Sequence, residues 1–248
     1  MISKSMGFMV TLLAALLFGS ASQAQDNPAK VPIYQASYSV GLGSIKAGDA
    51  RFTLKRDADG TYTYSSVTTA AGLVALFRSD VITETSHFRV IQDKLQSLHY
   101  TYDHSGNGKD EKQDIRFDWA QGIAHTTDDG RQKTLTVKPG TYDRLLAQLA
   151  ISMDLAEGRD VETYPILLHG EINVYHMLRQ DNTDLKTPAG YYETDVIARR
   201  DPHSDRVLTF WLAPKLDYLP VQIQQTEPGK ATISLMLTGI KFDSENSK

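Results

Sequence analysis

Histidine is the side chain of this sequence best suited to acid–base chemistry or metal binding near neutral pH. The chain contains seven of them: His87, His99, His104, His125, His169, His176 and His203. None stands in an HExxH pattern or in another spacing typical of metal ligands. If residues 98–104 form one strand, His99 and His104 lie on opposite faces and cannot share a metal ion without a bulge. We therefore expect no metal site and no bound cofactor.

Nucleophilic catalysis also leaves no recognisable motif. The sequence has no G-x-S-x-G pattern, which marks one class of exposed serine nucleophile. It has no cysteine, which excludes cysteine nucleophiles, disulfides, Cys-ligated zinc and thiol-linked lipid anchors. Gly41–Gly48 (GLGSIKAG) resembles a phosphate loop, but it lacks the final Lys-Ser/Thr pair and joins two predicted strands. No catalytic residue is indicated, although a His/Asp/Glu group assembled only by the fold would leave no local pattern.

The composition is that of an ordinary globular protein. The 248 residues include 26 Lys and Arg against 30 Asp and Glu, and 41% are hydrophobic. A formal net charge of −4 argues against nucleic-acid binding, because phosphate backbones require a local excess of Lys and Arg. We therefore expect no nucleic-acid partner. The partners considered below are a lipid or other amphiphile and a protein of the cell envelope.

The N-terminus has the pattern of a secretory signal peptide. A positively charged start precedes the apolar run Gly7–Gly19, which is too short to span a bilayer comfortably. Small residues then frame a cleavage point between Ala24 and Gln25. We expect residues 1–24 to be removed, leaving a single β-rich domain in the periplasm, without a lipid anchor and without a later membrane span. The alternative is an uncleaved N-terminal anchor.

The mature chain is predicted to be mainly β. Apolar residues occupy every second position within residues 33–42, 48–54 and 115–119, as expected for strands with one solvated face. Turn sequences such as Asp57–Gly60 and Ser105–Gly108 separate these segments at short intervals. The pattern predicts an antiparallel meander that forms a curved sheet or a half-open β-barrel.

One segment departs from this alternation. In Tyr142–Glu157 the apolar residues recur at helical spacing, and Gly158 follows as a stop signal. Thr141 is a suitable N-cap. We predict one main α-helix here, joining two halves of one sheet, with the best internal boundary near Gly140.

Two features are typical of a sheet that encloses a ligand. The segment Ala70–Phe77 (AAGLVALF) is the most apolar part of the mature chain, and is either buried core or a flap at the mouth of a cavity. Strands Ile172–Leu178 and Val207–Leu212 are apolar on both faces. Either the helix covers the second face, or the sheet curls around a ligand-filled interior, and both can hold together. The residues predicted to line this cavity are Leu73, Val74, Leu76, Phe77, Trp211 and His176.

Three motifs in the C-terminal half resemble those of a family of bacterial exported proteins, domain of unknown function 3108. They are Thr187–Tyr192 (TPAGYY), Phe210–Pro214 (FWLAP) and Asp217–Ile223 (DYLPVQI), and Gly140–Asp143 also fits. The resemblance extends over about Ile33–Phe242. It implies no known activity and transfers no catalytic residue. The expected layout is also similar to that of the periplasmic lipoprotein carriers, in which a curved antiparallel sheet wraps an apolar cavity, but this likeness concerns fold alone.

The sequence leaves three hypotheses. The first is a periplasmic protein that binds an apolar or amphipathic, lipid-like ligand in maintenance of the cell envelope. The second is a hydrolase acting on envelope glycans or lipids through a His/Asp/Glu group. The third is a structural or interaction protein without a ligand, which predicts a filled interior and an exposed apolar patch. We favour a binding protein over an enzyme.

Overall fold

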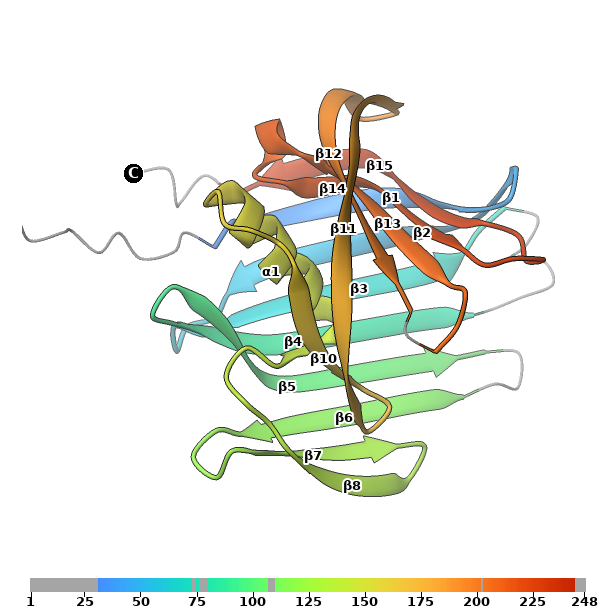
Figure 1. Ribbon diagram of the computed structural model, residues 1–248. Helices are drawn as coiled ribbons and strands as arrows, with labels where there is room; N and C mark the ends of the chain where they lie inside the picture. The colour runs from blue at the N-terminus through green and yellow to red at the C-terminus, as the bar shows by residue number, and fades with distance from the viewer. Residues whose placement is uncertain (1–30, 73–74, 76–79, 107–109, 202, 244–248) are drawn as a thin grey trace, which may run out of the picture.

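A computed structural model describes residues 31–243, apart from 73–74, 76–79, 107–109 and 202 (Figure 1). The predicted signal peptide lies outside these residues. The first eight strands of the described part are β1 (Tyr34–Leu42), β2 (Ile45–Arg56), β3 (Tyr62–Ala70), β4 (Val81–Ile91), β5 (Lys94–Ser105), β6 (Glu111–Asp118), β7 (Ile123–Asp128) and β8 (Arg131–Thr136).

The remaining elements begin with a two-residue strand that leads directly into the α-helix. In chain order they are β9 (Tyr142–Asp143), α1 (Arg144–Ala156), β10 (Thr163–Leu168), β11 (Glu171–Thr187), β12 (Gly190–Arg200), β13 (Val207–Ala213), the 3-10 turn η2 (Pro214–Leu216), β14 (Leu219–Thr226) and β15 (Ile233–Phe242). In the described part of the chain no helix has the length and hydrophobicity needed to cross a membrane.

All fifteen strands belong to one sheet, in the order β8-β7-β6-β5-β4-β3-β2-β1-β15-β14-β13-β12-β11-β10-β9. Neighbouring strands are antiparallel except β9 and β10. The two chain halves on either side of α1 meet where β1 pairs with β15, from Tyr34 opposite Phe242 to Leu42 opposite Ile233. The prediction that one helix joins two halves of one sheet is confirmed.

The sheet curves around α1 without closing (Figure 1). Its edge strands β8 and β9 do not pair with each other. The β10–β11 turn instead contacts the β7–β8 hairpin through side chains: His169 Nδ1 lies 3.2 Å from Asp128 Oδ1. The mainly β, half-open architecture with one main helix is therefore as predicted.

Strand alternation directs the predicted apolar faces to the inside of the curve. In β1, Tyr34, Ala36 and Tyr38 are buried, and in β2 the same holds for Ala50, Phe52 and Leu54. The hydroxyl groups of the buried tyrosines form hydrogen bonds within the core. Tyr34 donates to the Tyr64 hydroxyl at 3.1 Å, and Tyr38 donates to the backbone carbonyl of Pro220 at 2.7 Å. The alternation thus builds the core that packs against α1.

Helix α1 begins at Arg144, and its N-cap is Asp143, not Thr141 as predicted from the sequence. Tyr142 and Asp143 pair with β10 as strand β9, so strand pairing keeps these residues out of the helix. The Asp143 carboxylate accepts from the Leu146 backbone N–H at 2.8 Å. Gly158, with φ of 68°, follows the last turn as predicted.

Asp143 also joins the helix to the sheet. Its Oδ2 accepts from the hydroxyls of Ser86 on β4, at 2.6 Å, and Ser97 on β5, at 2.8 Å. Burial raises the pKa of Asp143, while the hydrogen bonds from Ser86, Leu146 and Ser97 act in the opposite direction. A fully buried carboxylate thus holds the start of α1 against two strands.

Replacing Asp143 by alanine is expected to lower the free energy of unfolding by about 2–4 kcal/mol. It removes a helix cap and leaves the buried Ser86 and Ser97 hydroxyls without their acceptor. Asp118→Ala is the matched control, because Asp118 caps the backbone N–H groups of Ala120 and Gln121 in an exposed turn. We expect it to cost less than about 1 kcal/mol. Urea denaturation measures both, and equal losses would contradict the role assigned to Asp143.

Candidate functional site

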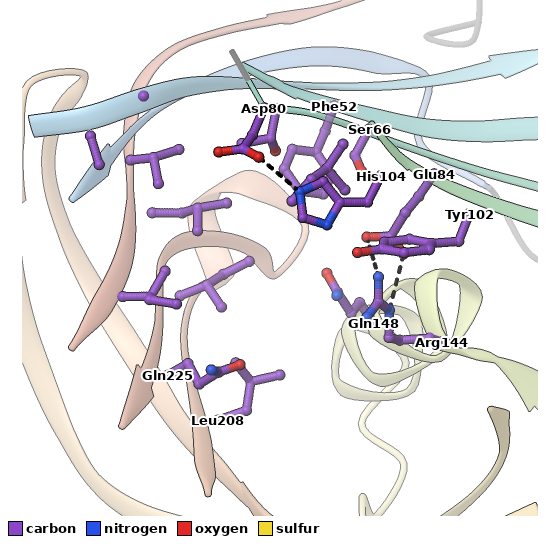
Figure 2. A pocket seen from close by; sticks show the side chains of 18 of the residues that line it. Phe52, Ser66, Asp80, Glu84, Tyr102, His104, Arg144, Gln148, Leu208 and Gln225 are labelled. Carbon is purple, nitrogen blue, oxygen red and sulfur yellow. Dashed lines mark hydrogen bonds and ion pairs between the residues drawn. The ribbon is translucent and has the colours of Figure 1, made fainter. Parts of the chain in front are cut away.

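The inside of the curved sheet contains a cavity of about 540 Å³ (Figure 2). Its wall is formed by β1 to β5, the first half of α1 and β10 to β15. The two halves of the chain therefore contribute opposite sides of one site. A volume of this size lies within the range of about 300–1,000 Å³ that is usual for small-molecule sites.

Cross-strand pairing arranges one side of the wall in rows. Ile223 on β14 pairs with Leu235 on β15, and Leu235 pairs with Val40 on β1. All three face the cavity. This inner row is apolar, so this part of the wall can hold a hydrocarbon group but offers no side-chain hydrogen bond.

The next row outward combines apolar and polar side chains. It runs from Arg199 on β12 through Leu208 on β13, Gln225 on β14 and Ile233 on β15 to Leu42 on β1. All five line the cavity. Leu42 and Ile233 are 40% and 38% exposed, which marks this row as the rim.

The opposite side of the cavity carries a clamped ion pair at the start of α1 (Figure 2). Arg144 donates to Glu84 through two nitrogens, Nη2 to Oε1 at 2.7 Å and Nε to Oε2 at 3.1 Å. Tyr100 donates its hydroxyl to Oε2 of the same carboxylate at 2.9 Å. The Arg144 guanidinium also lies 4.9 Å from the centroid of the Tyr102 ring. Both charges are therefore engaged by protein groups.

The contacts of Arg144 with Glu84 and its neighbours fix its charge state. Burial alone would lower the pKa of the guanidinium, but the nearby Glu84 carboxylate and the Tyr100 phenol outweigh it and raise the pKa above its ordinary value. Burial raises the pKa of Tyr100, and Glu84 raises it further. Arg144 and Glu84 thus form an ion pair on the cavity wall in which the two charges neutralise each other.

His104 forms a second polar group on the wall together with nearby carboxylates. Its Nε2 lies 3.3 Å from Asp80 Oδ1 and its Nδ1 lies 3.9 Å from Glu111 Oε2. His99 is instead 2.8 Å from Asp114, so the two histidines have separate partners, as the strand spacing predicts. Within the described ranges no serine or threonine hydroxyl is hydrogen-bonded to the His104 ring. The arrangement is therefore a histidine beside two carboxylates and not a nucleophile with its base.

The described part of the chain contains no candidate metal site. Among residues 31–243 outside the gaps given above, no group of three or more His, Asp or Glu side chains could hold a metal ion. The cavity therefore offers hydrogen bonding, charge and apolar contact as its means of holding a ligand.

Four of the predicted cavity residues, Leu73, Val74, Leu76 and Phe77, lie outside the described residues. The residues that bracket their segment are described. Ala70, at the end of β3, and Asp80, before β4, both line the cavity. The chain thus enters and leaves this apolar segment at the cavity wall.

The other two predicted residues, Trp211 and His176, are not on the wall of this cavity. Leu208, Phe210 and Leu212 point inward from β13, so alternation turns the partly buried Trp211 to the other face. In β11, Tyr175 faces the cavity and its neighbour His176 is exposed. The sequence could not assign these faces, because both strands carry apolar residues on each side.

The charged wall residues Glu84, Arg144, Arg199 and His104 were missed by the sequence analysis. Arg199 lies on the same face of β12 as the fully buried Ile197. The intervening residues of β12 are buried as well, so the alternation of side chains does not reveal which face lines the cavity. The pairing of Arg144 with Glu84 joins residues 60 positions apart and leaves no local pattern.

A second pocket, of about 790 Å³, lies beside the C-terminal half of α1. Two of its side chains share one carboxylate: Arg159 donates to Asp154, and Tyr164 donates its hydroxyl to the same group. Burial and the bond to Asp154 raise the pKa of Tyr164. We consider the first cavity the better candidate because the sheet encloses it and its wall is divided into apolar and charged regions.

Replacing Glu84 by glutamine is expected to lower the free energy of unfolding by about 1–3 kcal/mol, because the partly buried Arg144 loses its counter-charge. The side chains of Arg144 and Glu84 are 30% and 15% exposed. The double variant Glu84→Gln/Arg144→Gln is expected to lose less than the sum of the two single losses. The control is Lys46→Gln, which breaks an exposed pair with Asp49 and should cost less than about 0.5 kcal/mol. Additive losses in the double variant would show that the pair is not coupled.

Comparison with solved structures shows the fold again. The chain is similar to a crystal structure of a beta-barrel-like protein of the domain of unknown function DUF1849 from Brucella abortus. The TM-score is 0.56 at 11% sequence identity, covering 87% of this chain and all of that one. A "putative lipoprotein" from Parabacteroides distasonis aligns over 86% of this chain and 97% of its own, with 10% identity and a TM-score of only 0.33.

Sequence comparison identifies a family. No curated protein matches the chain. The family described as "Protein of unknown function (DUF3108)" matches residues 34–238, which include β1, α1 and nearly all of β15. The match covers most of the chain and contains the residues of both sides of the cavity wall. The chain therefore belongs to the DUF3108 family of proteins of unknown function.

Proposed function

We propose that this protein is exported to the periplasm and binds an apolar or amphipathic, lipid-like ligand inside its curved sheet, as part of cell-envelope maintenance. The observation that carries the proposal is the cavity itself, with an apolar row of Ile223, Leu235 and Val40 behind a mixed rim. A ligand with an apolar part gains free energy by removing its surface and that of the wall from water.

The other two hypotheses have less support. A hydrolase that used His104 as its base would need a ring nitrogen facing a nucleophile or water, but Nε2 lies 3.3 Å from Asp80 and Nδ1 lies 3.9 Å from Glu111. A purely structural protein was expected to have a filled interior, and the space inside this sheet is about 540 Å³. Export is supported by the N-terminal sequence pattern, which lies outside the described residues.

The cavity predicts where an apolar probe binds. The neutral dye N-phenyl-1-naphthylamine should bind the purified protein with increased fluorescence. Leu208→Asp and Leu235→Asp should each weaken binding about tenfold or more, because the charged side chain loses hydration when the probe covers it. Thr209→Asp is the matched control, on the other face of β13 next to Leu208. Unchanged affinity in both wall variants, with melting temperatures retained, would exclude this cavity as the site.

A native ligand can be sought directly. Small molecules extracted from the protein after detergent-free purification from the periplasm are expected to include a stoichiometric amphiphile by mass spectrometry. The double variant Leu73→Asp/Phe77→Asp should retain less of it, if the apolar segment bracketed by Ala70 and Asp80 contributes to binding. Equal retention by a folded variant would remove this segment from the proposal. An empty protein that also fails to bind the dye would overturn the proposed function.

A further inference from the structure

Arg199 is a cationic side chain on the cavity wall with no acidic partner. Its guanidinium carbon lies 4.3 Å from the centroid of the Tyr175 ring, so it rests on the face of a buried aromatic side chain. Within the described residues the guanidinium makes no hydrogen bond and no ion pair. Burial lowers the pKa of Arg199, which shows that the charge is held partly out of water.

The other basic groups of the wall contrast with Arg199. Arg144 is clamped by Glu84 at 2.7 Å and His104 lies 3.3 Å from Asp80. Arg206, at the rim, is 45% exposed and lies 3.5 Å from Glu227. Among the described wall residues, Arg199 is therefore the cation whose hydrogen-bonding capacity is left for a ligand.

The acidic side chains near Arg199 do not pair with its guanidinium. Glu84 and Asp80 are engaged by Arg144 and His104. Asp201 lies one strand position further out on the same face and accepts from the His203 backbone N–H at 2.8 Å. An unpaired, partly buried guanidinium costs the folded protein free energy, which favours a role in binding over a role in stability.

The position of Arg199 relative to the apolar row suggests the shape of the ligand. Arg199 pairs with Leu208 in the rim row, and the inner row of Ile223 and Leu235 lies two residues further along the strands, about 7 Å deeper. A hydrocarbon chain that extends from the inner row toward the rim on the β12 side ends beside Arg199. Gln225, in the same rim row, adds an amide that can donate a second hydrogen bond.

We propose that the ligand is an anionic single-chain amphiphile, whose carboxylate or phosphate head is bound by the Arg199 guanidinium while its hydrocarbon chain covers the inner apolar row. This rests on the proposed function and adds the charge of the ligand and the residue that recognises it. The planar guanidinium presents parallel N–H donors that match both oxygens of a carboxylate or two oxygens of a phosphate. Recognition inside the sheet is strengthened because water is partly excluded.

The experiment is displacement of N-phenyl-1-naphthylamine by three ligands with the same sixteen-carbon chain: palmitate, hexadecyl phosphate and hexadecanol. The unaltered protein is expected to prefer one or both anions to the neutral alcohol. Arg199→Gln should weaken anion binding by about tenfold to a hundredfold, since it removes a charge-assisted hydrogen bond, and change alcohol binding less than twofold. The two anionic arms distinguish a carboxylate ligand from a phosphate one. Arg200→Gln is the control, because it makes the same charge change on the exposed face of the same strand.

Stability provides a second readout that separates ligand recognition from a structural role. Arg199→Met retains much of the side-chain stem over Tyr175 and removes the unpaired charge, so its melting temperature should equal or exceed that of the unaltered protein. A fall in melting temperature with unchanged anion binding would assign Arg199 a structural role and overturn the proposal. Arg199→Lys retains the charge without the planar donors and should bind the anions with intermediate affinity, which tests the proposal even if Arg199→Gln fails to fold.

The outcomes distinguish this inference from the proposed function. In one outcome the dye binds, but palmitate, hexadecyl phosphate and hexadecanol displace it equally well, both from the unaltered protein and from Arg199→Gln. The proposed anion site is then wrong, while the apolar cavity remains supported. If the dye and all three ligands fail to bind the folded protein, the proposed function itself fails, and the inference fails with it.

Discussion

The buried carboxylate of Asp143 is the interaction on which the arrangement of the interior depends. It caps α1 and accepts hydrogen bonds from β4 and β5, so it sets where the helix begins inside the curve of the sheet. The next residue, Arg144, is thereby directed toward Glu84 and the cavity. One capping residue thus determines both the position of the helix and the location of the charged side of the site.

The cavity exists because the sheet is large and the helix that it surrounds is short. Fifteen strands curve around a single α-helix of 13 residues in the described part of the chain. The helix packs mainly against β3, β4, β5, β9 and β10. Space remains inside the sheet, and the side of its wall formed by β12 to β15 combines apolar side chains with Arg199 and Gln225.

Sequence patterns predicted the architecture well because the relevant signals are local. Alternation places Tyr34, Ala36 and Tyr38 inside, and the structure buries all three, whereas Leu42 at the end of the strand is exposed. The helical spacing after Tyr142 identifies α1 to within two residues. The wrong N-cap has a physical reason: Thr141 and Asp143 are both capping residues, and only the pairing of Tyr142 with Ile166 selects between them. The site was less accessible, because Trp211 and Leu208 are both apolar and alternation alone does not say which face is enclosed. Contacts such as Arg144 with Glu84 or Arg199 with Tyr175 depend on the folded topology.

The incomplete closure of the sheet bears on how firmly the width of its interior is fixed. In a closed barrel the strand number and stagger fix the diameter, because a continuous set of backbone hydrogen bonds joins the first and last strands. Here the ends approach each other through side chains, as in the contact between the exposed His169 and Asp128. Side-chain contacts of this kind exchange readily with water and contribute little to stability. The width of the interior is therefore not fixed by backbone pairing between the two edge strands, as it is in a closed barrel.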